Sequence, residues 1–406
     1  MSRIEASAQG SVPSRRIWMV FILGSLSAFG PLSLDMYLPA LPKLAGELNS
    51  STSMAQLSLT ACLLGLALGQ LYAGPVSDVR GRRLPLLIGL ILYGVSSMLC
   101  AVAPSAELLV LLRFIQGMAG SAGIVISRAI VRDMYSGTEL TKFFSLLMLV
   151  NGAAPILAPI AGGQLLEVTS WRGVFVVLGL IGVLMLIAVV LALPETLPQE
   201  RRSKGGLGNT LTTFRRLLSD RTFMGYALAQ GFVIAAMFAY ISGSPFVLQD
   251  IFGVSPQMFS VCFAINGLGI ILAGQVTGRL AGRVSDKRLL VSGLALASVA
   301  GVSLLLAIVS GAGLYAILVP LFFVVSSVGI VSTAGFSLAM RNQSESAGSA
   351  SALLGVLSFI FGGIVAPLVG IAGNQTAVPM GIVIAAADVS SVLCYLLLVR
   401  RHENKA

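Results

Sequence analysis

The sequence predicts an all-α polytopic membrane protein, with twelve transmembrane helices in two pseudo-symmetric halves of six. Three observations support this fold class. Only 10% of the 406 residues are charged and 56% are hydrophobic, whereas roughly a quarter of the residues in a soluble domain are charged. Apolar runs of about 20 residues, long enough to cross a hydrocarbon core ~30 Å thick, recur along the chain. A polar segment divides these runs six and six.

Each apolar run predicts one span. In chain order the spans are 17–38, 55–77, 84–103, 108–130, 143–165, 173–193, 223–248, 258–280, 289–309, 314–338, 347–371 and 378–399. The polar segment 195–221 separates an N-terminal half, 1–194, from a C-terminal half, 222–406.

Two motifs recur between the halves. Gly74-Pro-Val-Ser-Asp78 matches Gly274-Gln-Val-Thr-Gly278, and Ala158-Pro-Ile-Ala-Gly162 matches Ala366-Pro-Leu-Val-Gly370. The offsets of 200 and 208 residues predict a parallel repeat, the internal symmetry with which carriers alternate access to a central site.

The positive charge predicts the orientation. If both termini are cytoplasmic, 23 of the 26 Lys and Arg residues lie on inner segments, and the outer loops hold only Lys43 and Arg172. This asymmetry follows the positive-inside rule, so we expect a multi-pass protein of the cell membrane with both termini in the cytoplasm. The net charge of +10 then reflects topology. No nucleic-acid partner is expected, because few residues outside the spans remain to form a basic groove.

Apart from Arg128 and Arg279, which lie next to the inner ends of their spans, three charged residues lie inside predicted spans: Asp35, Arg113 and Asp388. A charge at a helix centre costs ~2.5–3.5 kcal/mol on insertion scales, so each one requires a partner or a task. Asp35 and Arg113 both fall in the outer part of the bilayer, on helix faces of small and polar residues. A carboxyl group that loses water binds a proton more readily, and a nearby cation opposes this. The two residues therefore predict a proton-coupling site.

Each of these residues also has a structural alternative. Asp35 could be an interfacial residue that ends the first span, and Arg113 could be a hydrogen-bonding hub for backbone carbonyls. For Asp388 we expect a packing hydrogen bond to Ser or Tyr, with a second proton site as the alternative.

Three motifs carry a resemblance to a known family. The hairpin after the second span reads Gly74-Pro-Val-Ser-Asp78-Val-Arg80-Gly81-Arg82-Arg83, the fourth span contains Leu109-x-x-x-Arg113-x-x-Gln116-Gly117, and the fifth contains Ala154-x-x-x-Ala158-Pro159-x-x-Gly162-Gly163. Over the whole chain the sequence resembles transporters of the major facilitator superfamily, most of all the bicyclomycin/chloramphenicol-resistance drug:proton antiporters. Val79 stands where the first motif usually has a basic residue, and alanines replace two glycines of the third.

The resemblance implies the major facilitator fold and a role for each motif. A gate motif comprises Gly74, Asp78, Arg80, Gly81, Arg82 and Arg83. It would hold the halves together in the outward-facing state and release them during inward opening, because a carboxylate at a helix junction can pair with basic side chains. A positive loop that only sets topology is the alternative. An antiporter motif for close packing comprises Ala158, Pro159, Gly162 and Gly163.

A drug cavity is mostly apolar and aromatic with a few polar groups. The candidates are Tyr37, Gln116, Met148, Asn151, Met237, Phe238, Tyr240, Asn266 and Phe361. The Met and aromatic side chains could instead face lipid or the core. The two asparagines are the better candidates, because an amide in hydrocarbon needs a partner or water.

Enzymatic chemistry is not expected. The only histidine is His402, and the chain has neither a lysine-ending phosphate loop nor a zinc-protease signature, so we expect no cofactor, no metal and no direct use of ATP. The expected function is proton-coupled multidrug efflux of small amphiphilic drugs by an alternating-access antiporter, with drug, protons and the lipid bilayer as partners of a monomer. A proton symporter that imports a small metabolite on the same fold is the main alternative. A channel or membrane-embedded scaffold is another.

Overall fold

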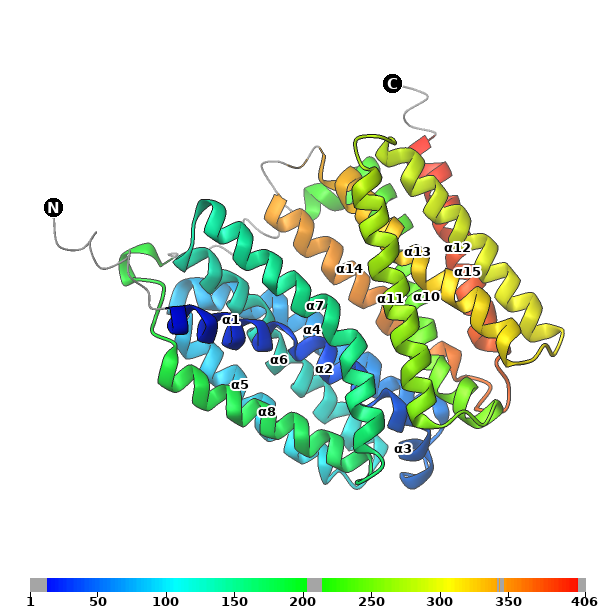
Figure 1. Cartoon of the computed structure of the whole chain (residues 1–406), viewed down its shortest axis with the longest axis horizontal. Helices are drawn as coiled ribbons and strands as arrows, with labels where there is room; N and C mark the ends of the chain where they lie inside the picture. Colours follow the sequence, from blue (N-terminus) through cyan, green and yellow to red (C-terminus); the bar gives the residue numbers. More distant parts are fainter. Residues whose placement is uncertain (1–12, 203–213, 342, 344–346, 401–406) are drawn as a thin grey trace.

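The computed structural model describes residues 13–202, 214–341, 343 and 347–400. For residues 13–17, 138, 141–142, 144–145, 148 and 347–349 only the backbone is described. The chain forms two helical bundles that lie side by side, one from the blue-to-green part of the sequence and one from the green-to-red part (Figure 1).

The N-terminal bundle contains the first six predicted spans. Its elements are α1 (Pro13–Ser27), α2 (Phe29–Asp35), the 3-10 turn η2 (Leu38–Ala40), α3 (Leu41–Glu47), α4 (Thr52–Arg80), α5 (Arg83–Ala101), α6 (Ala106–Met134), α7 (Gly137–Leu165) and α8 (Trp171–Ala192). The short turn η3 (Gln199–Arg201) follows in the predicted linker, of which residues 203–213 lie outside the described part.

The C-terminal bundle contains the other six. Its elements are α10 (Arg221–Phe246), the π-helical turn η4 (Val247–Ile251), α11 (Pro256–Leu280), α12 (Asp286–Val309), α13 (Leu314–Met340), α14 (Ala347–Val369), α15 (Val378–Cys394) and the π-helical turn η6 (Tyr395–Arg400). The all-helical fold class is therefore confirmed, and the domain boundaries after residue 194 and before residue 222 stay a prediction.

Most of the helices match the length of a membrane span. Among the described residues, ten helices are long and apolar enough to cross a bilayer, and the bent pair Trp18–Ser27 with Phe29–Glu47 makes an eleventh. The remaining span is α7, whose described apolar part, Leu149–Leu165, is shorter.

The first span differs from the single helix that its hydropathy predicts. It bends by 44° between α1 and α2. Pro31 explains the break, because proline has no N–H for the Ser27 carbonyl four residues earlier and its ring clashes with that carbonyl. After the bend, α2 runs to Asp35, four residues before Pro39, whose carbonyl oxygen accepts a hydrogen bond from Gln249 of the C-terminal bundle.

Glycines set the packing inside each bundle, and they do so in equivalent places. A Cβ on Gly117 of α6 would lie 2.2 Å from the Cys62 carbonyl oxygen of α4, and a Cβ on Gly329 of α13 would lie 2.2 Å from the Ile270 carbonyl oxygen of α11. Only glycine permits such an approach of two helix backbones. The second and fourth spans of one half therefore pack like those of the other.

The two bundles meet at one end of the molecule. We call the ends that carry the α4–α5 turn inner, after the predicted orientation, and the ends near α3 outer. Between the bundles, hydrogen bonds join Ser53 to Pro367, Gln56 to Ser242, Thr60 to Gly363, Gln249 to Pro39, Gln257 to Gly163 and Ser260 to Pro159. Each of these described bonds lies in the outer half of its helices, and in Figure 1 the bundles converge toward α3.

Candidate functional site

Arg113 lies at the centre of a buried polar cluster on α6. Its side chain is 0% exposed, although it carries a full charge. Its guanidinium donates to the Ser33 carbonyl oxygen at 2.7 Å and to the Gln116 amide oxygen, and its Cζ lies 4.3 Å from the centre of the Tyr37 ring. The Ser33 carbonyl is one of the last in α2, where helix geometry leaves carbonyls unpaired and favours a cation. Gln116 extends the cluster to the Ser97 hydroxyl at 2.7 Å.

Asp35 ends α2 beside this cluster. Its side chain is buried, with 7% of the residue exposed, and within the described part of the chain its carboxylate makes no hydrogen bond or ion pair. Four residues after Asp35, the Pro39 carbonyl oxygen accepts a hydrogen bond from the Gln249 amide of the other bundle at 3.2 Å. A carboxylate without partners is destabilised in such a place relative to the neutral acid.

The structure does not pair Asp35 with Arg113, although the sequence places them at one depth. Arg113 instead holds the Ser33 carbonyl, two residues before Asp35, because the bend at Pro31 brings the end of α2 over α6. This is the geometry of the carbonyl hub that we kept as the alternative. One donor of Arg113, its Nε, remains buried without a partner among the described residues.

The cavity candidates fall into separate contacts. Tyr37 is fully buried and hydrogen-bonds Ser58 at 3.2 Å. Asn266 donates to the Tyr240 hydroxyl at 2.9 Å, and Asn151 donates to the Ser27 hydroxyl at 3.3 Å and to the carbonyl of Leu147 at 2.8 Å. The two amides thus have the partners that hydrocarbon requires.

The remaining candidates are aromatic or thioether side chains. Phe361 packs on Phe232 with ring centres 4.9 Å apart, Phe238 is buried against Gly362, and Met237 is half-buried. The Met148 side chain lies outside the described part of the structure. Their lining of a drug cavity stays a prediction.

The antiporter motif lies where α7 meets α11. The Ser260 hydroxyl donates to the Pro159 carbonyl oxygen at 2.7 Å, and the Gln257 amide donates to the Gly163 carbonyl oxygen at 3.1 Å. A Cβ on Gly162 would lie 1.8 Å from the carbonyl oxygen of Met36, and a Cβ on Gly163 would lie 2.6 Å from the hydroxyl oxygen of Ser260. Ala158 is buried in the same contact region. The motif therefore lets α7 approach both the backbone at Met36, just after α2, and the opposite bundle.

The contact of α4 with α14 uses carbonyls that their own helix leaves free. Pro367 offers no N–H to the Gly363 carbonyl four residues earlier, and the Thr60 hydroxyl donates to this oxygen at 3.0 Å. Near the end of α14, the Ser242 and Ser53 hydroxyls donate to the carbonyl oxygens of Ala366 and Pro367 at 3.2 and 3.0 Å. These bonds satisfy backbone groups that would otherwise be bare in a membrane. The Thr60 and Ser53 bonds join α4 to α14 across the two bundles, whereas the Ser242 bond lies within the C-terminal bundle; we call the α4–α14 contact the outer gate.

The gate motif forms an ion cluster at the inner end, within the N-terminal bundle. Arg82 pairs with Asp78 and donates from Nε to Asp133 at 2.8 Å. Arg83 donates to the Val190 carbonyl oxygen at 2.7 Å. Among the described residues, no hydrogen bond or ion pair of this cluster reaches the C-terminal bundle. Within the described residues, the motif is therefore not linked to the other half.

Glu195 fastens the start of α5 to the chain that leaves α8. Its carboxylate accepts the backbone N–H groups of Arg82 at 2.9 Å and Arg83 at 3.2 Å. Partial burial raises the pKa of Glu195, but hydrogen bonds from the N–H groups of Leu197, Arg82, Arg83 and Thr196 outweigh it, so the net pKa lies below its ordinary value. Gly81 makes room: its φ is +90°, and a Cβ there would lie 2.5 Å from Glu195 Oε2.

We expect Glu195→Gln to lower the melting temperature at pH 7, because a neutral amide is a weaker acceptor than a carboxylate. A lowered folded-state pKa stabilises the fold above the unfolded-state pKa of about 4.3, and this contribution is lost as the pH falls through the folded-state value. The difference in melting temperature between wild type and variant should therefore shrink below about pH 4. Thermal unfolding of the detergent-purified protein measures it, with exposed Glu200→Gln as control. A difference that is constant from pH 7 to 3 would contradict the assignment.

The family model of the Major Facilitator Superfamily matches residues 21–367. The chain belongs to the Major Facilitator Superfamily. Among its relatives, an uncharacterized MFS-type transporter of Bacillus subtilis, YdgK, is 48% identical over 95% of this chain and 96% of the relative. A Bicyclomycin resistance protein homolog of Haemophilus influenzae is 31% identical over 94% and 96%, and Multidrug resistance protein D of Escherichia coli is 26% identical over 96% and 98%.

Solved structures of the superfamily share the fold. The nucleoside transporter NupG matches with a TM-score of 0.77 at 13% identity, over 95% of this chain and 100% of that one. A D-xylose-proton symporter matches with a TM-score of 0.71 at 15% identity, over 94% and 97%. The chain is thus a multi-pass membrane transporter of small molecules and not an enzyme.

The Major Facilitator signature did not reveal every residue of the sites. Sequence reasoning missed Asp133 and Glu195 as members of the inner cluster, and it missed Thr60 in the outer gate. Acidic residues in a strongly basic inner segment were the signal for the first two. A proline four residues after Gly363 was the signal for the third, because it frees a carbonyl.

The contacts of the Asp388 side chain differ from those that the sequence predicts. It is 0% exposed between α15 and α12, and both carboxylate oxygens lack a hydrogen-bond partner among the described residues. The serines beside it donate to its backbone carbonyl instead, Ser298 at 3.0 Å and Ser391 at 2.6 Å. The expected packing hydrogen bond of its side chain is therefore wrong. Because an unpaired carboxylate is costly there, Asp388 is best accommodated as a neutral acid.

Proposed function

We propose that this transporter exports small amphiphilic drugs in exchange for protons by alternating access, as a monomer in the cell membrane with both termini cytoplasmic. Its relatives include proteins named for resistance to bicyclomycin and to multiple drugs. The positive-inside count supports the orientation.

One observation carries the proposal: Asp35 is a buried carboxyl without a described partner, at the broken end of the first span, four residues before the Pro39 carbonyl that Gln249 of the other bundle binds. An intramembrane acid in this condition is a functional-site candidate by default, and Asp35, unlike Asp388 between α12 and α15, lies beside the contact between the two bundles. Because the outer gate is closed next to it, we assign the structure to the inward-facing state. In that state Asp35 would release its proton to the cytoplasm and allow a drug to bind.

Arg113 would act as a positioning residue for Asp35. It now holds the α2 carbonyl next to the acid, and its Nε has no described partner. A change in the bend between α1 and α2 would bring the Asp35 carboxylate to Arg113 Nε. Arg113 would then compete with the proton for Asp35, since a nearby cation favours the charged form.

The test is drug-induced proton release from proteoliposomes that contain the purified full chain. A panel of chloramphenicol-type and cationic compounds is added, and internal pH and drug content are followed together. We expect saturable uphill drug movement opposite to the proton flux, which stops when a protonophore removes the gradient. Drug and protons moving in one direction would indicate a symporter, unsaturable flux a channel, and equal drug accumulation without a gradient would exclude proton coupling.

A further inference from the structure

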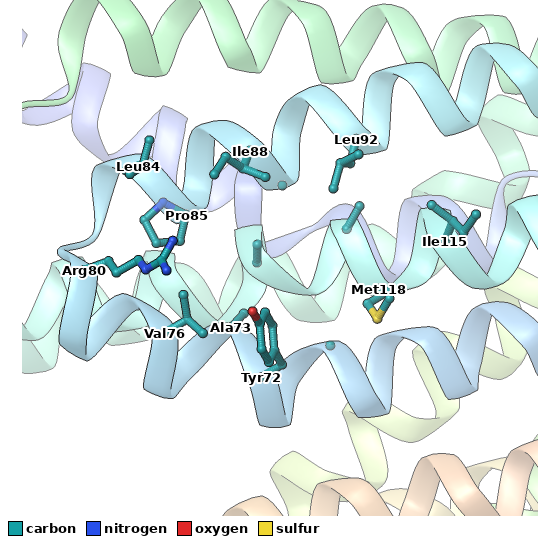
Figure 2. A pocket seen from close by; sticks show the side chains of 14 residues that line it. Tyr72, Ala73, Val76, Arg80, Leu84, Pro85, Ile88, Leu92, Ile115 and Met118 are labelled. Atoms are coloured by element: carbon teal, nitrogen blue, oxygen red, sulfur yellow. The ribbon is translucent and has the colours of Figure 1, made fainter. Parts of the chain in front are cut away.

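A groove opens on the lateral surface of the N-terminal bundle, where α4 and α5 both pack on α6 (Figure 2). Its volume is ≈ 430 Å³. It is lined by Gly69, Tyr72, Ala73, Val76 and Arg80 of α4, by Leu84, Pro85, Ile88, Gly89 and Leu92 of α5, and by Ile115, Met118, Ala119 and Ala122 of α6. We call it the Tyr72 groove. The residues of the proton site and the outer gate are not part of its lining.

Small residues create this groove. A Cβ on Gly69 would lie 2.6 Å from the Met118 carbonyl oxygen, and a Cβ on Gly89 would lie 2.7 Å from Cβ of Ala122. Both α4 and α5 are therefore drawn tightly onto α6. Alanine side chains on the floor are too short to fill the space that remains between α4 and α5.

The groove is apolar and faces the bilayer. Tyr72 is 68% exposed, and Ile88 and Leu92 are each 48% exposed. From Gly69 to Arg80 the groove follows α4 for eleven residues, about 16 Å at ~1.5 Å per residue. This is about half of a ~30 Å hydrocarbon core. The groove therefore has the length of one leaflet, and its contents must be apolar over that length.

A free cation marks the inner end of the groove. Arg80 is exposed, and within the described part of the chain its guanidinium makes no hydrogen bond or ion pair. Its neighbours are occupied, because Arg82 pairs with Asp78 and Asp133 and Arg83 binds the Val190 carbonyl. In Figure 2 the Arg80 side chain lies beside Pro85, at the mouth of the apolar channel. The Tyr72 groove thus combines an apolar lining of one-leaflet length with a positive charge at headgroup depth.

We propose that the Tyr72 groove binds an acyl chain of an anionic phospholipid of the inner leaflet, with the lipid phosphate at Arg80. Charge complementarity selects the anionic headgroup, since a basic residue near the membrane surface attracts anionic lipid. The apolar lining of the groove selects the acyl chain of the lipid. This lipid would stabilise the α4–α5 hairpin, which carries the gate motif, and so link lipid composition to the gate.

Native mass spectrometry of the full chain in detergent tests the site. Phosphatidylglycerol and phosphatidylcholine with identical acyl chains are the probes. Arg80→Gln should weaken the tightest phosphatidylglycerol binding about fivefold, since one basic residue contributes this much attraction, and should weaken phosphatidylcholine binding less, because the choline cation offsets the charge of its phosphate. Val76→Phe, which places a ring in the groove, should remove one tightly bound lipid of either headgroup. Arg279→Gln removes an exposed last-turn arginine from α11, the repeat equivalent of α4, and should change neither.

Three results would overturn the proposal. One is wild-type protein that binds both lipids equally tightly. Another is Arg279→Gln weakening phosphatidylglycerol binding as much as Arg80→Gln does. The third is displacement of the bound lipid by chloramphenicol, which would make a drug the occupant. Because Arg80 is exposed, Arg80→Gln should fold normally, and it decides the question even if Val76→Phe does not fold.

Discussion

Asp35→Asn is expected to reduce pH-gradient-driven drug efflux in proteoliposomes to the level of empty vesicles. An amide cannot take up or release a proton, so drug export would no longer be coupled to proton import. Under the proposed exchange the proton and the drug compete, so drug binding to the wild type should weaken as the pH falls, by the reciprocity of linked equilibria. In the variant the affinity should no longer depend on pH. Flux assays and drug titrations between pH 6 and 8 measure both effects.

Two companion variants make this result specific to Asp35. Asp388→Asn removes the other buried intramembrane carboxyl, between α12 and α15, and should keep coupled efflux and its pH dependence. Asp35→Glu keeps a titratable group and should recover part of the coupling. Coupled efflux that persists in Asp35→Asn would exclude this residue as the proton carrier.

Gly163→Leu is expected to prevent closure of the outer gate and to reduce efflux about tenfold or more. Even a Cβ at this position would lie 2.6 Å from the hydroxyl oxygen of Ser260 on the opposite bundle. Overpacking of this kind costs about 1–3 kcal/mol, and such an energy shifts a two-state equilibrium by about 5- to 150-fold. The shift disfavours only the state in which α7 and α11 touch. The transporter should therefore accumulate with its outer side open.

Reaction of a cysteine in the outer gate measures this shift. Ser53→Cys in a cysteine-free background lies against Pro367 when the gate is closed, so a membrane-impermeant maleimide should label it faster when Gly163→Leu is also present. Gly355→Leu places the same side chain on a helix where a Cβ meets nothing within 4 Å and should leave labelling unchanged. Unchanged labelling in Gly163→Leu would show that the α7–α11 contact does not govern the gate.

The fold could be predicted because hydrophobicity and charge act over whole spans. The six-and-six division and the positions of the spans follow from apolar length, which the bilayer thickness fixes. The bend between α1 and α2 was missed, although Pro31 was visible in the sequence. Hydropathy reports how apolar a segment is and carries no information on the direction of the helix axis. This bend of 44° places the Ser33 carbonyl of α2 against Arg113 of α6.

The candidate site was predictable in depth but not in its contacts. Counting residues along a helix gives depth in the membrane, and it predicts Asp35 and Arg113 at one level. It gives no information on the rotation of a broken helix, so it left open whether Arg113 acts on Asp35 or binds backbone carbonyls, and it could not identify the Ser33 carbonyl as the partner. The inner cluster shows the same limit: Asp78 and Arg82 are one helical turn apart and could be paired from spacing, whereas Asp133 and Glu195 come from distant segments.

The freed carbonyl of Gly363 makes outward opening depend on water. When the bundles part at this point, the Thr60 hydroxyl leaves, and α14 has no amide to replace it because residue 367 is proline. Only a water molecule can then donate a hydrogen bond to the Gly363 carbonyl oxygen, so water must enter the outer gate before the gate can remain open. Osmolytes that lower water activity should consequently hold the carrier shut toward the outside.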